Sequence, residues 1–164
     1  MKKRYFKASW STTLRLLTLV FAGLLLLLPA GLLWRTQPVT MGDAIAGVAI
    51  PWSILATSAA FSVRGYSIAG RDLIIHHFAF TRRYPLAELE QATIDPAATQ
   101  LSIRTFGIGG LGGYIGWFRN QQLGNYLAFV TNSANQVVLR FRSRTVVISP
   151  DNPGAFMAEI EARS

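Results

Sequence analysis

A glycine-rich stretch at residues 106–120, FGIGGLGGYIGWFRN, holds the residues whose spacing most resembles a chemical site. Residues 107–112 match the pattern G-x-G-x-x-G, in which backbone N–H groups at a helix start cradle a pyrophosphate. Such a site needs a preceding strand, a helix that begins within the glycines and an acid about twenty residues later. Here a strand-like segment follows at 123–131, and residues 121–136 contain no acid. We therefore expect no nucleotide site.

Other reactive side chains do not form a recognisable catalytic group. His76 and His77 are adjacent in an expected strand, so they point to opposite faces and cannot share one metal ion. Glu88 and Glu90 share a strand face, but a solvated edge explains them better than an acid–base pair. The chain has no cysteine and no G-x-S-x-G nucleophile motif. We expect no catalytic residue, no metal and no cofactor, and hence no enzymatic activity.

The aromatic residues of the glycine-rich stretch suggest a contact surface instead. Tyr114, Trp117 and Phe118 would be costly to expose in water, and three arrangements would avoid that cost. They fold back onto their own domain, insert at a lipid interface, or contact a protein partner. A stripe of arginines further along the chain is either a solvated face or a contact for anionic lipid. The candidate contact residues are Tyr114, Trp117, Phe118, Arg119, Arg140 and Arg142.

Two uncharged segments precede this region and predict a membrane hairpin. Residues 16–34 are leucine-rich and would span roughly 28 Å as a helix, close to the thickness of a bilayer core. Pro29 is expected to kink this helix, and Trp34 and Arg35 to anchor it at the interface. A cleaved signal peptide is the alternative, although no cleavage motif follows closely.

The second segment, 44–63, is less hydrophobic and carries small residues in rows, expected to pack against the first helix: Ala49, Ser53 and Thr57, and also Ala56 and Ala60. A buried or an interfacial helix is the alternative here. The connector 35–43 is too short to be a domain, so the two segments should form a hairpin.

The distribution of charge predicts the orientation of that hairpin. The net charge is +8, and residues 1–15 carry five of the positive charges, on Lys2, Lys3, Arg4, Lys7 and Arg15. A basic flank favours the cytoplasmic side, which places both chain termini in the cytoplasm. The remaining basic excess is small and forms no dense run, so we expect no nucleic-acid binding.

The region 64–164 changes to short apolar blocks separated by turn signals, which indicates a small barrel or sandwich. Residues 149–153, SPDNP, indicate the start of a closing helix, because Asp or Asn can cap it and Pro153 suits its first turn. We expect strands at 66–69, 72–78, 80–86, 88–95, 101–106, 124–131, 137–142 and 145–149.

Several short motifs in this region carry a resemblance to a known family. They are RTFG at 104–107, GYIG at 113–116, FRN at 118–120, LGNY at 123–126, and ISPDNP at 148–153 with Phe156. Residues 63–162 thereby resemble the bacterial pleckstrin-homology-like (PH) domains that follow a two-helix membrane hairpin. The resemblance implies a seven-strand split barrel capped by a C-terminal helix, with no established catalytic activity. Inositol-lipid recognition does not carry over, because the first hairpin turn has one basic residue, Arg71.

These observations lead to two functional expectations. The first is a multi-pass protein of the bacterial inner membrane whose cytoplasmic PH-like domain is a non-catalytic binding or assembly module. Its partner would be another protein or a second copy of the chain. The alternative is a lipid- or small-ligand-sensing domain that reads the membrane surface through the glycine-rich stretch.

Overall fold

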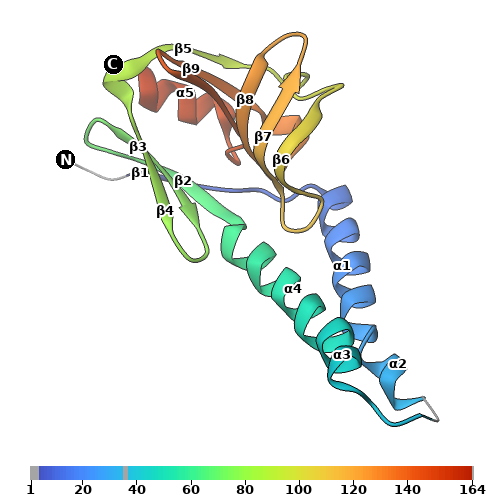
Figure 1. Cartoon of the computed structure of the whole chain (residues 1–164). Coiled ribbons are helices and arrows are strands. Elements are labelled where there is room, and N and C mark those ends of the chain that lie inside the picture. The colour runs from blue at the N-terminus through green and yellow to red at the C-terminus, as the bar shows by residue number, and fades with distance from the viewer. Residues whose placement is uncertain (1–3, 35–36, 164) are drawn as a thin grey trace.

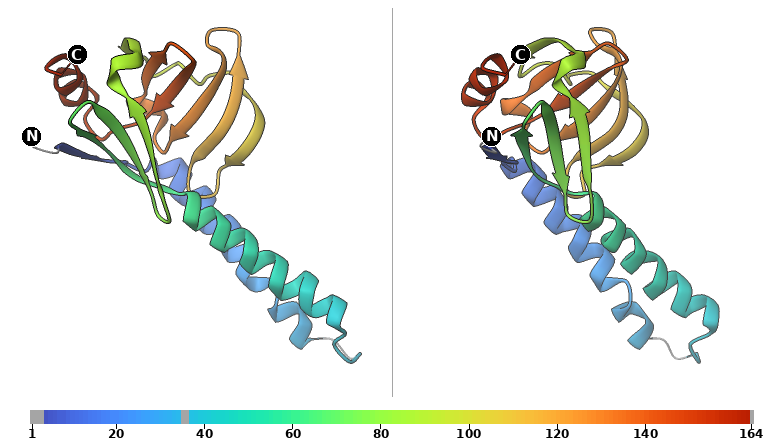
Figure 2. Two further views of the ribbon diagram at one scale, coloured as in Figure 1. Left: turned by 60° about the vertical axis from the view of Figure 1, so that its left-hand side comes forward. Right: turned by 90° about the vertical axis from the view of Figure 1, so that its left-hand side faces the viewer.

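A β-rich domain and two helical segments that project from it make up the protein, whose computed structural model describes residues 4–34 and 37–163 (Figure 1). The helical segments lie beside each other, and their connection is at the end far from the domain (Figure 2). Lys2, Lys3 and Arg35, which enter the charge and anchoring arguments, lie outside the described residues.

The first helical segment is interrupted where proline was expected to disturb it. Helix α1 (Thr12–Leu27) begins at Ser11, whose hydroxyl accepts a hydrogen bond from the backbone N–H of Leu14 at 3.2 Å. The regular helix ends before Pro29, because proline lacks an N–H donor and clashes with the preceding turn. The short helix α2 (Ala30–Leu33) follows.

The second segment is continuous but locally widened. Helix α3 (Met41–Ala44) starts at Thr40, which exchanges hydrogen bonds with Asp43 in a capping box. The π-helical turn η1 (Ile45–Ala49) follows and leads into α4 (Ile50–Phe61). Pro51 is the second residue of α4, and its missing N–H explains why the hydrogen-bond ladder shifts to the wider π spacing just before it.

The small-residue row does not pack as expected. Ala49, Ser53 and Thr57 are exposed and lie along an open hollow instead of against α1. Ser58, one position further, is buried and lines the space between the helices with residues of α1. Because successive helix positions differ by about 100° in direction, the row faces away from the actual contact. The prediction that the row packs on the first helix is therefore wrong.

Two sheets form the domain. Strands β1 (Arg4–Lys7), β2 (Val63–Ala69), β3 (Asp72–His77) and β4 (Thr81–Pro85) form the first sheet, in the order β1-β2-β3-β4. The second sheet has the order β5-β9-β10-β8-β7-β6. Its strands are β5 (Leu89–Ile94), β6 (Ile103–Gly109), β7 (Tyr114–Asn120), β8 (Gly124–Val130), β9 (Val137–Phe141) and β10 (Arg144–Ile148). All neighbouring strands are antiparallel except β8 and β10.

The N-terminal residues form a strand of the domain, although no strand was expected before residue 64. Strand β1 pairs with β2, and its Phe6 is buried in the core against the ring of Phe156. Gly65 permits this approach, because a Cβ there would collide with the ring of Tyr5. The pairing joins the residues before α1 to the strand that directly follows α4.

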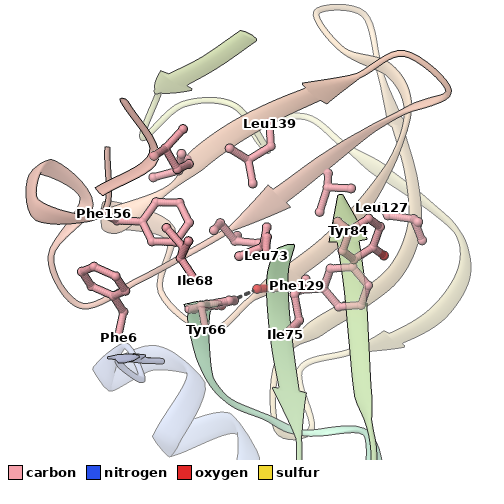
Figure 3. Packing of buried hydrophobic residues seen from close by; sticks show 14 of the residues in the cluster. Phe6, Tyr66, Ile68, Leu73, Ile75, Tyr84, Leu127, Phe129, Leu139 and Phe156 are labelled. Atoms are coloured by element: carbon pink, nitrogen blue, oxygen red, sulfur yellow. Dashed lines mark hydrogen bonds between the residues drawn. The ribbon is translucent and has the colours of Figure 1, made fainter. Parts of the chain in front are cut away.

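The core lies between the two sheets and the C-terminal helix α5 (Pro153–Glu161) (Figure 3). Asn152 caps this helix, and Phe156 and Ile160 are its buried residues. Tyr66 is fully buried, and its hydroxyl donates to the Phe129 carbonyl at 2.6 Å and accepts from the Ser149 N–H at 3.1 Å. Burial raises the pKa of Tyr66 to about 12, so its hydroxyl stays neutral and keeps donating.

The predicted fold class is confirmed: two N-terminal helical segments precede an open, split arrangement of two sheets closed by a C-terminal helix. The described residues form ten strands rather than the seven that the family implied. One source of the difference is the stretch 106–120, which was expected to be a loop. It forms most of a β6–β7 hairpin around a short turn at residues 110–113.

Candidate functional site

The turn of the β6–β7 hairpin is held between the two helical segments. The hydroxyl of Thr18, on α1, donates to the Gly110 carbonyl and accepts from the Gly112 N–H, both at 3.2 Å. The hydroxyl of Ser62, just after α4, donates to the Gly112 carbonyl at 3.2 Å. The glycine-rich hairpin therefore bridges the domain and both helices at the point where they meet.

A facing pair of glycines explains the composition of this hairpin. Gly107 and Gly116 are opposite each other, with φ angles of +125° and +134° that L side chains rarely adopt. A Cβ on Gly107 would collide with the Ile115 carbonyl oxygen, and one on Gly116 with the Phe106 carbonyl oxygen. The two backbones cross in close contact, which only glycine allows on both sides.

The G-x-G-x-x-G pattern thus has a structural rather than a chemical cause. Residues 107–112 run from β6 into the turn, and the chain continues as strand β7 rather than as a helix. The histidines also lie apart: His76 contacts the Ser67 hydroxyl through Nε2 at 2.8 Å, whereas His77 is buried. Across the described ranges, no three His, Cys, Asp or Glu side chains are grouped as a metal site would require.

The candidate residues on β7 divide between the two faces of the sheet. Tyr114 and Phe118 point to the outer face and line a cavity of about 430 Å³ with Tyr126 and Gln136. Phe118 is 7% exposed, and its ring stacks on that of Tyr126. It thus folds back onto its own sheet, whereas Tyr114 stays 39% exposed.

Trp117 and Arg119 lie on the opposite face, which also carries the core residue Ile115, but both stay exposed there. Their cross-strand neighbours on β6 are Phe106 and Ile103, which are 77% and 73% exposed. Trp117 itself is 40% exposed. We call the surface formed by Ile103, Phe106, Trp117 and Arg119 the hairpin face. It borders the free edge of β6, the last strand of its sheet.

The other two candidate arginines do not join this surface. Arg140 lies on β9, which β10 and β8 separate from β7. Arg142 lies in the β9–β10 turn, where its backbone N–H donates to the Glu88 carbonyl at 3.0 Å. Both side chains are exposed, so they form a separate basic area of the second sheet.

A cavity of about 360 Å³ opens between the edge of the first sheet, the end of α4 and the hairpin. Its walls are mainly apolar side chains of the second sheet, including Ile115, Leu127 and Phe129, and it shares Phe106 and Trp117 with the hairpin face. Thr57 and Phe61 close it on the α4 side, and Arg82 of β4 supplies its one charged lining residue. We call this cavity the seam pocket. The sequence analysis did not select Arg82, although its spacing from Tyr84 would place both on the same face of a strand.

The β3–β4 turn caps the C-terminal end of α4 beside this pocket. The N–H of Ala79 donates to the Ala60 carbonyl at 3.1 Å, and the N–H of Phe78 donates to the Ser62 carbonyl at 3.0 Å. His77 contributes a third bond through Nδ1 to the Phe61 carbonyl at 2.6 Å. The last carbonyls of a helix have no partner within the helix, so this turn attaches α4 firmly to the first sheet.

His77 is expected to make stability depend on pH. Burial lowers its pKa below the ordinary value, the bond to the Phe61 carbonyl opposes that shift, and Arg82 and His76 add to it. The unfolded chain therefore binds a proton more readily, and the free energy of unfolding falls as pH drops below about 6.5. Unfolding in detergent at pH 7.5 and pH 5 should show this loss, and His77→Gln should reduce it. His76→Gln is the control; an equal pH dependence in all three proteins would contradict the assignment.

The fold and the hairpin motifs together define a PH-like domain linked to two long apolar helical segments. A family model described as bacterial PH domain matches residues 64–164, which is more than half of the chain. The chain therefore belongs to the bacterial PH domain family. No curated protein and no solved structure matches it. PH domains are in general non-catalytic modules that bind proteins or lipids.

Proposed function

We propose that this protein is a non-catalytic binding and assembly module anchored in the bacterial inner membrane, with its PH domain on the cytoplasmic face. The observation that carries the proposal is the exposure of its helical segments. Thr12–Leu32 and Met41–Phe61 each have 21 residues, and only 6% and 11% of their apolar windows are buried. Helices of this length extend about 32 Å, enough to cross a bilayer core. A soluble core helix would be mostly covered, so lipid is the natural cover for these two.

The N-terminal strand supports a hairpin in which both ends lie on the same side. Strand β1 precedes α1, β2 follows α4, and the two strands pair. If both helices cross the membrane, the second crossing returns the chain to the side from which the first began. The pairing of β1 with β2 requires this return, because paired strands must lie on the same side. The basic residues of the first 15 positions favour the cytoplasm for that side. Cleavage after α1 would remove Phe6 from the core, which argues against a signal peptide.

The hairpin face is the proposed assembly surface. Ile103, Phe106 and Trp117 expose apolar area on one face, and the edge of β6 presents backbone groups without a neighbouring strand. Such an edge accepts an added strand from a partner or a second copy. The alternative function, lipid or small-ligand sensing, is favoured by the seam pocket and its arginine.

Site-specific photocrosslinking in intact membranes tests this surface. A photoreactive amino acid replacing Ile103 should give a discrete adduct, at twice the chain's mass for self-association or at another mass for a partner. The same group replacing Arg71, exposed in the β2–β3 turn, serves as the control. Adding Phe106→Asp should remove the adduct, because a charge disrupts an apolar contact. Equal crosslinking at both positions, or none at Ile103, would contradict the proposed surface.

A further inference from the structure

The seam pocket combines an apolar interior with a single positive charge. Its volume of about 360 Å³ lies within the range of small-molecule sites. Arg82 lines it from β4, on the same strand face as buried Tyr84, and is itself exposed. Its guanidinium lies 5.6 Å from the ring centre of Phe129 and 5.9 Å from that of Phe80. No carboxylate forms an ion pair with Arg82 anywhere in residues 4–34 and 37–163.

A cation stacked on aromatic rings and lacking an acidic partner is suited to bind an external anion. Arginine presents a planar set of donors that matches phosphate and carboxylate oxygens. Arg82 is exposed, so the apolar walls of the pocket would exclude competing water only where they adjoin it, and they would strengthen such a pair on that side. The pocket therefore fits an amphiphile whose anionic group meets Arg82 and whose hydrocarbon part contacts the walls.

The position of the pocket indicates where such an amphiphile would come from. Thr57 and Phe61, which close the pocket, belong to the last turns of the apolar segment Met41–Phe61. A shallower hollow continues from the pocket along α4, and the two share Thr57 and Ile108. Ile50 and Ile54 line this hollow. Ser53, Thr57 and Ser58 line it as well, so a hydrocarbon chain that leaves the pocket along α4 would pass both isoleucines and hydroxyl groups.

We propose that the seam pocket binds one anionic phospholipid of the surrounding membrane, with its phosphate at Arg82 and one acyl chain directed along α4. This assignment rests on the proposed membrane anchoring and names the ligand of the module. It does not involve the first hairpin turn, where Arg71 is the one basic residue. A phospholipid bound in the seam pocket would contact Arg82 of the first sheet, the hairpin and α4 together, and would thereby connect these elements.

The test uses the full chain in lipid nanodiscs that contain phosphatidylglycerol with a photoactivatable acyl chain. Wild type should be labelled at Thr57 and Ile108, which the pocket and the hollow share, or at Leu127 in the pocket wall, as peptide mass spectrometry would show. Arg82→Gln should lower this labelling about tenfold, as expected for loss of a charge-assisted bond, and Arg82→Lys should restore part of it. Arg83→Gln is the matched control, because it removes an adjacent charge from the opposite face of β4.

Each outcome decides the assignment. Pocket labelling that depends on Arg82 and is absent with a phosphatidylcholine probe supports it. Labelling confined to the exposed leucines of α1, or pocket labelling that is equal in Arg82→Gln and Arg83→Gln, overturns it. A crosslinked protein seated on Trp117 with no lipid in the pocket would also overturn it. Extraction of the protein from cell membranes by alkaline carbonate would instead contradict the membrane anchoring, so the two failures are distinguishable.

Discussion

Gly116→Ala should abolish the native hairpin and lower the free energy of unfolding by more than about 3 kcal/mol. Two causes add at this position. Its φ of +134° is costly for any L residue, and the new Cβ would collide with the Phe106 carbonyl oxygen. Neither β6 nor β7 can yield easily, because Gly107 on the other strand is equally constrained. Thermal unfolding in detergent, followed by circular dichroism, measures the loss.

Gly124→Ala separates the two causes. Gly124 also has a positive φ, +66°, but an added Cβ there would meet open space. Its replacement should cost only about 1 kcal/mol, from backbone strain alone. If Gly116→Ala were no more harmful than Gly124→Ala, the close crossing of the two strands would be wrong. Since the hairpin turn contacts Thr18 and Ser62, Gly116→Ala should also loosen the helices from the domain.

Phe6→Ala should destabilise the domain by about 3–5 kcal/mol, the usual cost of removing a buried phenylalanine. The expected effect is large for a residue so near the N-terminus, where truncation is ordinarily tolerated. Phe6 is 5% exposed, packs on Phe156 of α5 and belongs to the main core cluster. Chemical denaturation of the full chain in micelles gives the free-energy difference.

Lys7→Ala is the matched control for this prediction. Lys7 is the next residue of β1, is exposed, and leaves strand pairing with Gly65 intact when truncated. It should change stability by less than about 0.5 kcal/mol. Similar losses for Phe6→Ala and Lys7→Ala, or no loss for either, would mean that β1 is not part of the folded domain.

Much of the fold follows from local signals in the sequence. Gly70 and Arg71 between two apolar runs identified the β2–β3 hairpin, and Asn152 with Pro153 identified the start of α5. Strand β1 was not predicted, because it has only four residues and a single core side chain, Phe6. Its strand character comes from pairing with β2, a partner about sixty residues away, and no local pattern records that pairing.

The candidate site was predicted in part. The glycine-rich stretch was singled out correctly as an unusual segment, but glycine's low strand propensity hid the two strands that it forms. The pairing of Gly107 with Gly116 explains why both strands contain glycine, since neither position has room for a Cβ against the opposite backbone. Arg82 was missed because the seam pocket draws on β4, α4 and the hairpin, which lie near one another only in the folded chain.

Cysteine accessibility in intact spheroplasts tests the proposed membrane hairpin most directly, and the chain has no native cysteine to interfere. Val39→Cys would place a thiol in the connection between the helices, and Ser133→Cys would place one on the domain; both positions are exposed. We expect a membrane-impermeant maleimide to label position 39 in intact spheroplasts and position 133 only after lysis. Labelling of position 133 in intact spheroplasts, or protection of position 39 until lysis, would contradict the account.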